Sequence, residues 1–520
     1  MMAGIVTSAP KFNAPDDEFD YVVIGAGSSG CVIVNRLTAD PSVRVLLLEA
    51  GGPNVDPLIQ LPGKWTTLLG TALDWNYQIE AVPGLGGRSI RWPRGKAYGG
   101  STTISAMAYV RGHQLDFAGW AETCGAGWDY ASVLPHFRRI EDNSRGASDF
   151  HGAASENDPR SHFRQAVTDQ TDPHAGHLAF LEAARDLGYA ANPHWDFSGA
   201  TQENGAGFYQ KNIRAGRRHS AAAAFLTPVI ARPNLTVWPN THVLRLLFEG
   251  TRATGVACAR PTAAADVRAR RGVILSAGTI GTPKILMLSG IGPADALRAH
   301  GIAVRMDRPG VGANLHDHPR VPVRWAARAP FAPSSVSAGL LTWSQRGATP
   351  RPPDLQFYVG RGIDTPDPAI TLTVALSRPV SRGRVSLRSA DPMAAPLIQP
   401  NYLAEPADVD ALVEGVRIAR ALAGTRAYTT LRGAATDPGD AVRTGHEVRA
   451  YIRRVADTMF HPVGTCRMGR DAEAIVDPQL RVRGVEGLWV ADASVMPVSV
   501  NCQTHAATAM IGERLATEFL

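Results

Sequence analysis

Apolar positions near the start of the chain form two short runs, with a glycine-rich turn after the first. The first run, residues 21–24, lies in "FDYVVIGAGSSGCVIVNRL", and the second lies in "VRVLLLEAGG" and ends at Glu49. Short continuous apolar runs bounded by turn residues are typical of strands that are buried on both faces. The pattern therefore predicts a strand, a tight turn, a helix and a second buried strand.

Two later segments show a related pattern. Residues 273–292, "VILSAGTIGTPKILMLSGIG", indicate a strand, a turn, a helix and a second turn. Near the end of the chain, residues 488–490 are apolar and residues 504–519 favour a helix. We therefore expect the middle and the end of the chain to supply further strand and helix units.

The region between residues 319 and 454 has a different character. "PDLQFYVG", "AITLTVALSRP" and "GRVSLRS" alternate β-branched and apolar residues, which is typical of strands in a half-exposed sheet. "DVDALVEGVRIARALAG" has apolar residues at helical spacing after an acidic start. Residues 140–175 are polar and show little periodicity. We expect a surface loop there, either a lid over an active site or a plain mobile loop.

Composition places these elements in a packed globular protein of two to four domains, or one large domain with insertions. The 520 residues are 44% hydrophobic and 19% charged, with a net charge of +6 and one short basic run at 268–271. That charge is too mild and too scattered for nucleic-acid binding. The odd number of cysteines, five, argues against a disulfide framework and for a reducing compartment.

The sequence also predicts where the protein resides. The first sixteen residues lack a basic start followed by an apolar core, so they do not indicate a secretory signal. The longest apolar runs, such as "VLLLEA", are much shorter than a membrane span. We therefore expect a soluble cytoplasmic protein without a membrane span.

The first turn has the pattern of a dinucleotide-binding site. It fits G-x-G-x-x-G with the residues Gly25, Gly27, Ser28, Ser29 and Gly30. The glycines allow a sharp turn, close approach of a pyrophosphate and helix packing, and the helix N-terminus attracts the phosphates. Glu49 stands 24 positions after Gly25, where a carboxylate can bond the adenosine ribose. The motif itself does not choose between NAD and FAD.

A second loop of small residues suits the same type of ligand. In "WPRGKAYGGSTTISAMAYVRG", the residues Gly99, Gly100 and Ser101 form a flexible turn. Small residues with free backbone N–H groups allow close approach to a planar cofactor or its linker.

"MFHPVGTCRMG" raises a chemical question, because His461 precedes Cys466 by five residues. A zinc site needs three or four ligands at recognisable spacing, and no such spacing accompanies this pair. A cysteine nucleophile needs an electropositive, partly exposed thiol, for which the sequence gives no reason. A core histidine would be the leading interpretation of the motif in isolation. The fourth interpretation is an acid/base histidine.

Several segments, taken in order, resemble the glucose–methanol–choline (GMC) family of FAD oxidoreductases. They are the G-x-G-x-x-G turn, the 99–101 loop, residues 278–292, "GVGANLHDHP", "HPVGTCRMG" and "ADASVMP". The resemblance covers nearly the whole chain. The nearest branches are those of the choline and sorbose dehydrogenases and of the pyridoxine and aryl-alcohol oxidases.

This resemblance implies an α/β fold with an α+β substrate part. A Rossmann-like FAD-binding domain, formed by residues 15–150, 205–318 and 455–520, would be interleaved with a substrate-binding domain. The latter, built on an antiparallel sheet, would take residues 151–204 and 319–454, with a candidate lid at about 140–175.

The resemblance also implies particular roles for residues. His461 would face the flavin as the base that takes the hydroxyl proton, with His505 as its partner. The helix that His505 opens would lower its pKa through the positive end of its dipole. The further FAD contacts would be Ser105, Ala106, Val243, Asp492 and Ala493. Ser105 and Tyr98 depart from the family pattern, which usually has asparagine at 105.

The implied activity is oxidation of a primary or secondary alcohol to the aldehyde or ketone, by hydride transfer to flavin N5. Ile104 stands where some members have a histidine linked to FAD, so we expect noncovalent FAD and no metal. The alternative is a lyase of the same fold, similar to the hydroxynitrile lyases. The alcohol and the electron acceptor, whether oxygen, a quinone or another compound, stay open, as does the choice between monomer and dimer.

Overall fold

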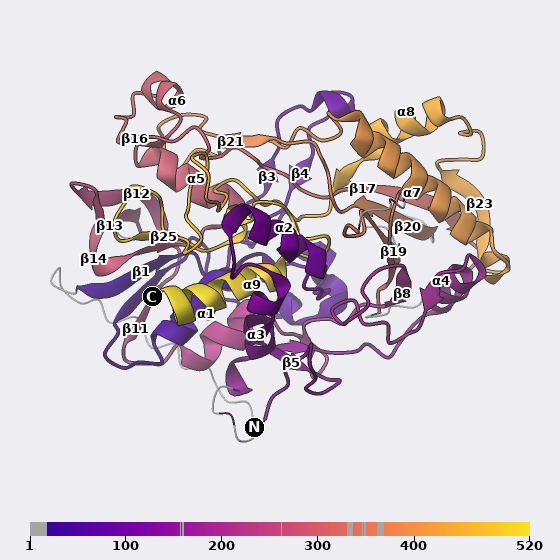
Figure 1. Ribbon diagram of the computed structural model, residues 1–520, viewed down its shortest axis with the longest axis horizontal. Coiled ribbons are helices and arrows are strands. Elements are labelled where there is room, and N and C mark those ends of the chain that lie inside the picture. Colours follow the sequence, from indigo (N-terminus) through magenta and orange to yellow (C-terminus); the bar gives the residue numbers. More distant parts are fainter. Residues whose placement is uncertain are drawn as a thin grey trace.

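Two β-sheets organise the chain in the computed structural model, with helices packed around and between them (Figure 1). The structure describes residues 18–520 apart from 156–157, 159–160, 262, 330–335, 346, 348–349 and 361–368. The first sixteen residues, in which we expect no secretory signal, lie outside this part. Segments from the beginning, middle and end of the chain contribute to the first sheet. The second sheet is built mainly from the region between the middle and the end of the chain.

The first sheet has seven strands in the order β11-β2-β1-β14-β13-β12, and β25 also pairs with β14. The pairs of β1 with β2 and β14, of β2 with β11 and of β14 with β25 are parallel, and the β12-β13-β14 pairs are antiparallel. The strands are β1 Phe19–Ile24, β2 Val45–Leu48, β11 Leu235–Trp238, β12 His242–Glu249, β13 Arg252–Ala259, β14 Ala264–Leu275 and β25 Leu488–Val490.

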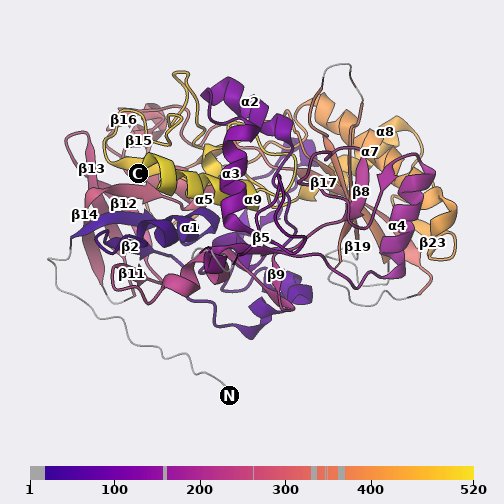
Figure 2. The same cartoon turned by 60° about the horizontal axis from the view of Figure 1, so that its bottom comes forward.

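Burial explains why the apolar runs predicted strands correctly here. Every residue of β1 and β2 is buried, as expected for parallel strands covered on both faces. Helices α1 and α9 pack against each other beside this sheet (Figure 2). Gly512 of α9 lies against Ser29 of α1, where an added Cβ would crowd the serine backbone. The end of the chain therefore holds the first helix in place.

Helices of different origin surround the two sheets. Their bounds are α1 Ser28–Leu37, α2 Gln114–Cys124, α3 Tyr130–Ile140, α4 Ala175–Asp186, α5 Gly278–Leu288, α6 Ala294–Ala299, α7 Pro406–Gly424, α8 Gly445–Val455 and α9 His505–Arg514. The predicted helix at 504–519 continues after α9 as a short π-helix, Leu515–Phe519.

The second sheet is largely antiparallel and has the order β23-β17-β20-β19-β18-β8-β7, with β24 on β17. Its strands are β7 Ala190–Ala191, β8 Gly205–Phe208, β17 Pro319–Ala327, β18 Ala338–Thr342, β19 Leu355–Gly360, β20 Ala369–Leu376, β23 Arg432–Asp437 and β24 Asp457–Thr458. This sheet confirms the predicted architecture.

The prediction that these strands are half-exposed is wrong for β20 and β19. Seven of the eight residues of β20 are buried. Helices α7 and α4 contact one side of these strands, and on the other side Tyr358 and Thr373 line an internal cavity. Polar residues in these strands therefore face a cavity rather than solvent. "GRVSLRS" contributes only β21 Arg384–Ser386, which pairs with β22 Leu397–Gln399 outside the large sheet.

The remaining short strands form two-stranded pairs outside the two large sheets. They are β3 Tyr77–Gln78 with β4 Arg91–Trp92, β5 Glu141–Asn143 with β6 Gln165–Val167, β9 Ile213–Arg214 with β10 Arg217–Arg218, and β15 Ile291–Gly292 with β16 Met306–Asp307.

The polar segment 140–175 contains ordered structure in its described part. Glu141 is fully buried and bonds to Arg111 and to His151, whose second ring nitrogen lies 2.8 Å from Asp196. The polar composition of the segment 140–175 therefore reflects a buried network of hydrogen bonds as well as an exposed loop. The lid role stays a prediction, as does the domain division. Strands β8 and β24, which that division assigned to the FAD domain, pair within the second sheet.

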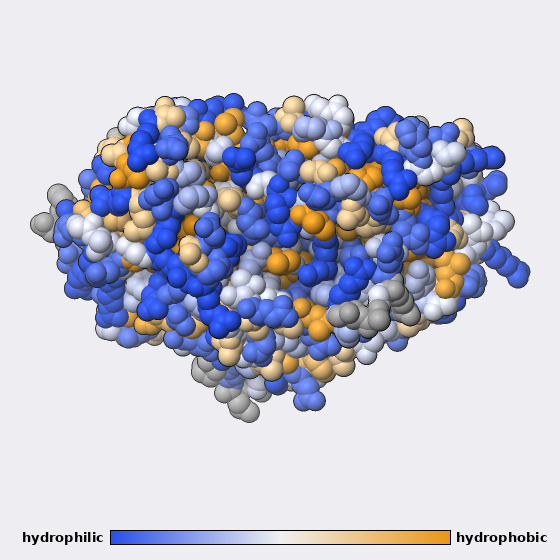
Figure 3. Space-filling model, turned by 45° about the horizontal axis from the view of Figure 1, so that its top comes forward, coloured by the Kyte–Doolittle hydropathy of each residue, from blue (hydrophilic) through white to orange (hydrophobic). Residues whose placement is uncertain are grey.

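The distribution of apolar residues bears on whether the protein could cross a membrane. On the face drawn in Figure 3, apolar residues form small groups among hydrophilic ones. Across residues 18–520, outside the gaps given above, no helix is both long enough and apolar enough to cross a membrane.

Candidate active site

A cavity of about 1190 Å³ is lined by residues from both sheets. It begins at the carboxyl ends of β1 and β2, passes α5 and the loop after residue 99, and reaches β19, β20 and residues 459–462. Pockets for small ligands usually measure about 300–1,000 Å³. This cavity is therefore large enough for an extended cofactor and a small substrate together.

The turn after β1 shapes one end of the cavity. Gly25 has φ +98°, a conformation that L side chains rarely adopt, and Gly27 is the N-cap of α1. Gly30 does not line the cavity. A Cβ at Gly30 would overlap the carbonyl oxygen of Gly25, so its role is to let α1 pack close to the turn. Ser28 and Ser29 line the cavity at the helix N-terminus, where unpaired N–H groups favour phosphate.

Glu49 closes this end of the cavity. Its carboxylate accepts hydrogen bonds from the N–H groups of Ala26 at 2.8 Å and Gly51 at 2.7 Å. Burial raises the pKa of Glu49, and the two backbone donors act in the opposite direction. A carboxylate has about four acceptor positions, so each oxygen can still accept from a ribose hydroxyl.

The loop after residue 99 touches the first turn. Gly99 has φ +90° and donates from its N–H to the carbonyl of Ala26 at 2.7 Å, without lining the cavity. Gly100 lies so close to Gly27 that a Cβ would come within 2.9 Å of its Cα. Ser101, Ser105 and Ala106 line the cavity beyond this contact. The two glycine-rich turns therefore meet, as one cradle for backbone contact with a ligand.

Segments from the middle and the end of the chain complete the wall. Val243 on β12 and Ala493 after β25 line the cavity. The carboxylate of Asp492 accepts from the N–H of Gly278 at 2.8 Å and from the Thr282 hydroxyl at 2.6 Å. Asp492 therefore joins the end of β25 to the start of α5, in addition to lining the cavity.

His461 lies at the far end of this cavity and is only partly buried. Its N–H donates to the carboxylate of Asp317 at 2.6 Å, and the same carboxylate accepts from Thr458 at 2.5 Å and from the Tyr402 hydroxyl. Asp317 thus fixes the backbone of the turn that carries His461. Burial, and then the proximity of His318, hold the pKa of His461 well below its usual range, so the ring is neutral at pH 7.

The hydrogen bonds behind His461 are satisfied when His461 carries its proton on Nδ1. Its Nδ1 lies 3.1 Å from Nδ1 of His318, whose Nε2 lies 2.9 Å from Oγ of Ser499. The Ser499 hydroxyl donates to the carbonyl of Val500 at 3.0 Å, so Oγ accepts from Nε2–H of His318. Nδ1 of His318 then accepts from Nδ1–H of His461. This leaves Nε2 of His461 unprotonated, the state that a general base requires.

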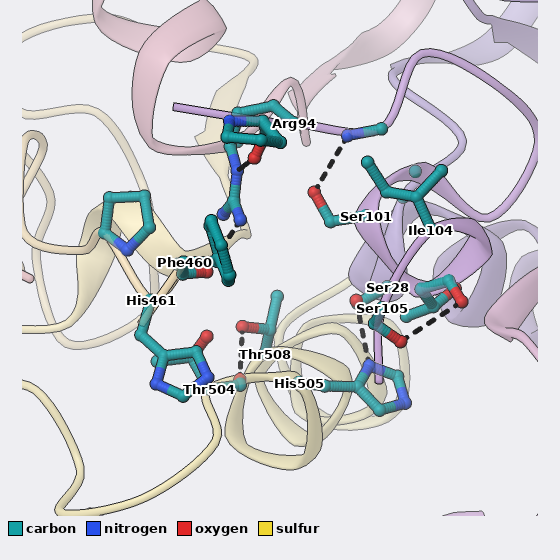
Figure 4. Close-up of a pocket in the computed structure, with 18 of the residues that line it drawn as sticks. Ser28, Arg94, Ser101, Ile104, Ser105, Phe460, His461, Thr504, His505 and Thr508 are labelled. Carbon is teal, nitrogen blue, oxygen red and sulfur yellow. Dashed lines mark hydrogen bonds between the residues drawn. The ribbon is translucent and has the colours of Figure 1, made fainter. Parts of the chain in front are cut away.

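His505 begins α9 and lines the same cavity. Its Nδ1 lies 2.9 Å from Oγ of Ser28, and its Nε2 lies 3.3 Å from Oε1 of Gln165. Burial lowers the pKa of His505 to about 4, and the contribution of the helix dipole expected from the sequence stays a prediction. The two histidines line different sides of the pocket, and the His505 ring is directed toward Ser28 (Figure 4). Their shared contact with one substrate oxygen stays a prediction.

Cys466 has the properties of a buried structural residue. Its side chain is fully buried, and burial raises the pKa of its thiol well above the usual range. A thiolate nucleophile at this position is therefore unfavourable. In the described part of the chain, no group of three or more His, Cys, Asp or Glu side chains could hold a metal ion.

Sequence reasoning assigned no role to several residues that shape the site. Asp317 and His318 belong to "GVGANLHDHP", a segment used only for the family resemblance. Arg94 donates to the carbonyl of Phe460 at 2.6 Å and so supports the turn before His461. Arg218 is buried and donates to the carbonyl of Ser105 at 2.6 Å. The adjacent residues Asp317 and His318 were the one signal that the sequence offered, and it did not indicate which residue they would contact.

Comparisons with known proteins agree with this geometry. The sequence model of the GMC oxidoreductases matches residues 19–320 with its N-terminal part and 379–512 with its C-terminal part. An alcohol dehydrogenase (acceptor) of Pseudomonas putida is 39% identical, over 96% of this chain and 95% of its own. Human mitochondrial choline dehydrogenase is also 39% identical, over 96% of this chain and 89% of its own.

A solved structure shows the same fold. Pyridoxine 4-oxidase from Mesorbium loti superposes with a TM-score of 0.89 at 33% identity, over 96% of this chain and 99% of its own. The family matches span most of the chain, and these relatives cover nearly all of it. On these grounds the chain belongs to the GMC oxidoreductase family.

Proposed function

We propose that this protein oxidises an alcohol to an aldehyde or ketone with noncovalently bound FAD. The observation that carries the proposal is that the dinucleotide cradle and the partly buried ring of His461 line one continuous cavity. The family is FAD-dependent, and relatives named above are alcohol and choline dehydrogenases and an oxidase acting on pyridoxine. Alcohol oxidation uses both ends of the cavity, because it needs a bound flavin as hydride acceptor and a base for the hydroxyl proton.

The residues at the cradle fit FAD by their shape. Three glycines, Gly25, Gly30 and Gly100, lie where a Cβ would collide with neighbouring backbone, so their lack of a side chain lets the two glycine-rich turns and α1 pack closely together as the cradle. Glu49 suits an unphosphorylated ribose because its carboxylate can accept from the hydroxyl groups. When bound at this cradle, FAD would supply the acceptor for the carbon-bound hydrogen of the alcohol as hydride.

The chain's own residues supply the proton chemistry. Nε2 of His461 takes the hydroxyl proton of the alcohol, and the positive charge that develops is shared toward His318 through the Nδ1 contact at 3.1 Å. Because burial and the neighbouring His318 hold the pKa of His461 well below its usual range, the ring is neutral before the reaction and able to accept a proton. His505 lines the other side of the cavity as a hydrogen-bond partner. To reach the alcohol oxygen, its ring must exchange the bond to Gln165 for one to the substrate.

An anaerobic experiment tests the proposed function directly. Mixing the yellow protein with a panel of benzylic, pyridine-methanol, sugar and short polyol substrates should bleach the flavin with at least one of them. A lyase would convert its substrate without bleaching, and none of the relatives named above is a lyase. If no alcohol bleaches the flavin, the proposed function is wrong.

FAD should be released by acid precipitation, with the yellow colour in the supernatant. The reason is that Ile104 occupies the position where linkage would need a histidine. Its side chain is 4% exposed and packs with Ile59 and Leu68. The measurement is the flavin absorbance of the supernatant and of the pellet. Flavin that stays with the pellet would show a covalent bond.

Glu49→Ala should weaken FAD binding by about 10- to 100-fold. The variant loses hydrogen bonds to a charged acceptor, which contribute about 1.5–3 kcal/mol each. Turnover per bound flavin should change less than occupancy, because Glu49 lies at the nucleotide end of the cavity. Fluorescence titration of the apoprotein with FAD measures both variants, and Glu122→Ala, on the exposed face of α2, is the control. Equal affinities for Glu49→Ala and the parent would contradict the assignment.

A further inference from the structure

Lys211 is a buried cation in the wall of the active-site cavity. It is 7% exposed and lines the cavity together with His177. Its backbone is fixed by hydrogen bonds with Thr168, at 3.0 Å from its N–H and 2.9 Å to its carbonyl. It also forms a β-bridge with Ala108, which follows the predicted FAD contact Ala106. Lys211 therefore lies beside the end of the cavity that faces the second sheet, away from Glu49.

Apart from Lys64, which is exposed, the other cations of the described cavity wall have partners. Arg320 is paired with Asp457 at 2.7 Å, and Lys284 donates to the carbonyl of Pro392 at 2.6 Å. Arg94 donates to the carbonyls of Pro93 and Phe460. Within the described residues, the ammonium of Lys211 has no hydrogen-bond or ion-pair partner. A buried cation without a partner is unfavourable unless a ligand supplies the opposite charge.

Carboxylates of the cavity wall do not balance this charge. Among the described lining residues, only Glu49 and Asp492 are acidic, and both accept backbone hydrogen bonds at the cofactor side. Asp172 raises the pKa of Lys211, but it is exposed and does not line the cavity. The cavity wall also contains apolar and aromatic groups, including Val336, Val359 and Tyr358.

We propose, on the basis of the proposed function, that Lys211 binds a carboxylate carried by the alcohol substrate at the end remote from its hydroxyl group. The substrate class is thus an alcohol with an apolar body and an anionic end. An alcohol with a quaternary ammonium group would place a cation in a cavity that already holds an unbalanced one. The similarity to choline dehydrogenases therefore does not extend to their cationic substrate.

The ionisation of the surrounding groups agrees with this role. Burial lowers the pKa of Lys211 to about 8, with Asp172 and Arg218 acting in opposite directions. Burial also lowers the pKa of His177 to about 3 and that of His174 below its usual range. Lys211 is then the nearby group that changes charge between pH 7 and 9. Binding of an anionic ligand should be strong at pH 7 and should weaken as the pH rises through about 8.

A binding experiment with the holoenzyme tests the charge preference without turnover. The probes are 4-methylbenzoate, 4-methylbenzamide and 4-methylphenyltrimethylammonium, followed by the change in flavin absorbance. A second, aliphatic series uses butanoate, butanamide and the butyltrimethylammonium ion. We expect the carboxylate to bind about 10- to 100-fold more tightly than the amide, as for a hydrogen bond to a charged group, and the cation to bind most weakly.

Variants distinguish an effect of Lys211 on ligand binding from an effect of the protein's net charge. Lys211→Met keeps the length of the side chain and should remove the preference for the carboxylate and its pH dependence. Lys211→Arg should retain the preference at pH 9, because the guanidinium stays charged. Arg298→Met removes one charge from the exposed helix α6 and should change nothing. Melting temperatures with bound FAD show whether each variant is folded.

The outcomes distinguish this inference from the proposed function. Equal binding of the carboxylate and the amide in both series, or an unchanged preference in Lys211→Met, overturns the role of Lys211. Anaerobic mixing with 4-(hydroxymethyl)benzoate, benzyl alcohol and choline provides the activity arm, in which the carboxylate should bleach the flavin fastest. If no alcohol bleaches the flavin while the carboxylate still binds through Lys211, the function fails and the anion site stands.

Discussion

His461→Ala should slow anaerobic flavin reduction by about 10²–10⁴-fold while FAD stays bound, because loss of a general base has an effect of this size. The structure gives the physical reason. The turn that carries His461 is fixed by Asp317, and the hydrogen bond with His318 leaves Nε2 of His461 as an acceptor. Stopped-flow absorbance with a good alcohol substrate measures the rate in parent and variant at equal flavin content.

Two further variants sharpen this prediction. His446→Ala changes an exposed histidine on α8 and should leave the rate unchanged. His505→Asn should have a milder effect than His461→Ala, since an amide can still donate a hydrogen bond to the alcohol oxygen. Parental rates in His461→Ala, or a large effect confined to His505, would show that His461 is not the base.

Gly30→Ala should abolish stable FAD binding, with an affinity at least about 100-fold lower than that of the parent. The added Cβ would overlap the carbonyl oxygen of Gly25, and both groups belong to backbone that cannot move independently. Overpacking of this kind costs about 1–3 kcal/mol, and here it distorts the turn that holds the phosphates. FAD titration of the apoprotein and the flavin content after purification measure the effect.

Gly119→Ala is the matched control for this substitution. Gly119 lies within α2, and a Cβ built there meets no atom within 4 Å. Alanine in a helix interior is favoured over glycine by roughly 0.5–1 kcal/mol, so this variant should bind FAD as the parent does and be at least as stable. Normal FAD binding by Gly30→Ala would mean that the turn tolerates the extra group and that its role is smaller than we infer.

Local patterns were sufficient to predict the elements of the first sheet. Every residue of the two strands that end at Ile24 and Leu48 is buried, so their apolar composition alone indicated strands. The glycines of the first turn were predictable for a similar reason, since the backbone at Gly25 requires a positive φ. Resemblance to the GMC family then predicted the antiparallel sheet, which the structure and the comparisons confirm.

Periodicity was a weaker guide in the second sheet and in the polar segment after residue 140. Polar residues of β19 and β20 face the cavity, which a pattern of alternation cannot distinguish from solvent. Glu141 and His151 are buried because each finds a charged or polar partner far away in sequence, among them Arg111 and Asp196. Such pairing is not visible in the local composition.

The sequence by itself determined the family, the cofactor type and the residues proposed to contact FAD, because these depend on short motifs with a local backbone requirement. Only the tertiary structure decided how those residues are charged and oriented. The contact of His461 with His318 spans 143 positions, and that of His505 with Ser28 spans 477. Lys211 likewise has no local motif, and its significance comes from burial in a cavity formed by both sheets. Ionisation and hydrogen bonding depend on neighbours in space, which the fold brings together from distant parts of the chain.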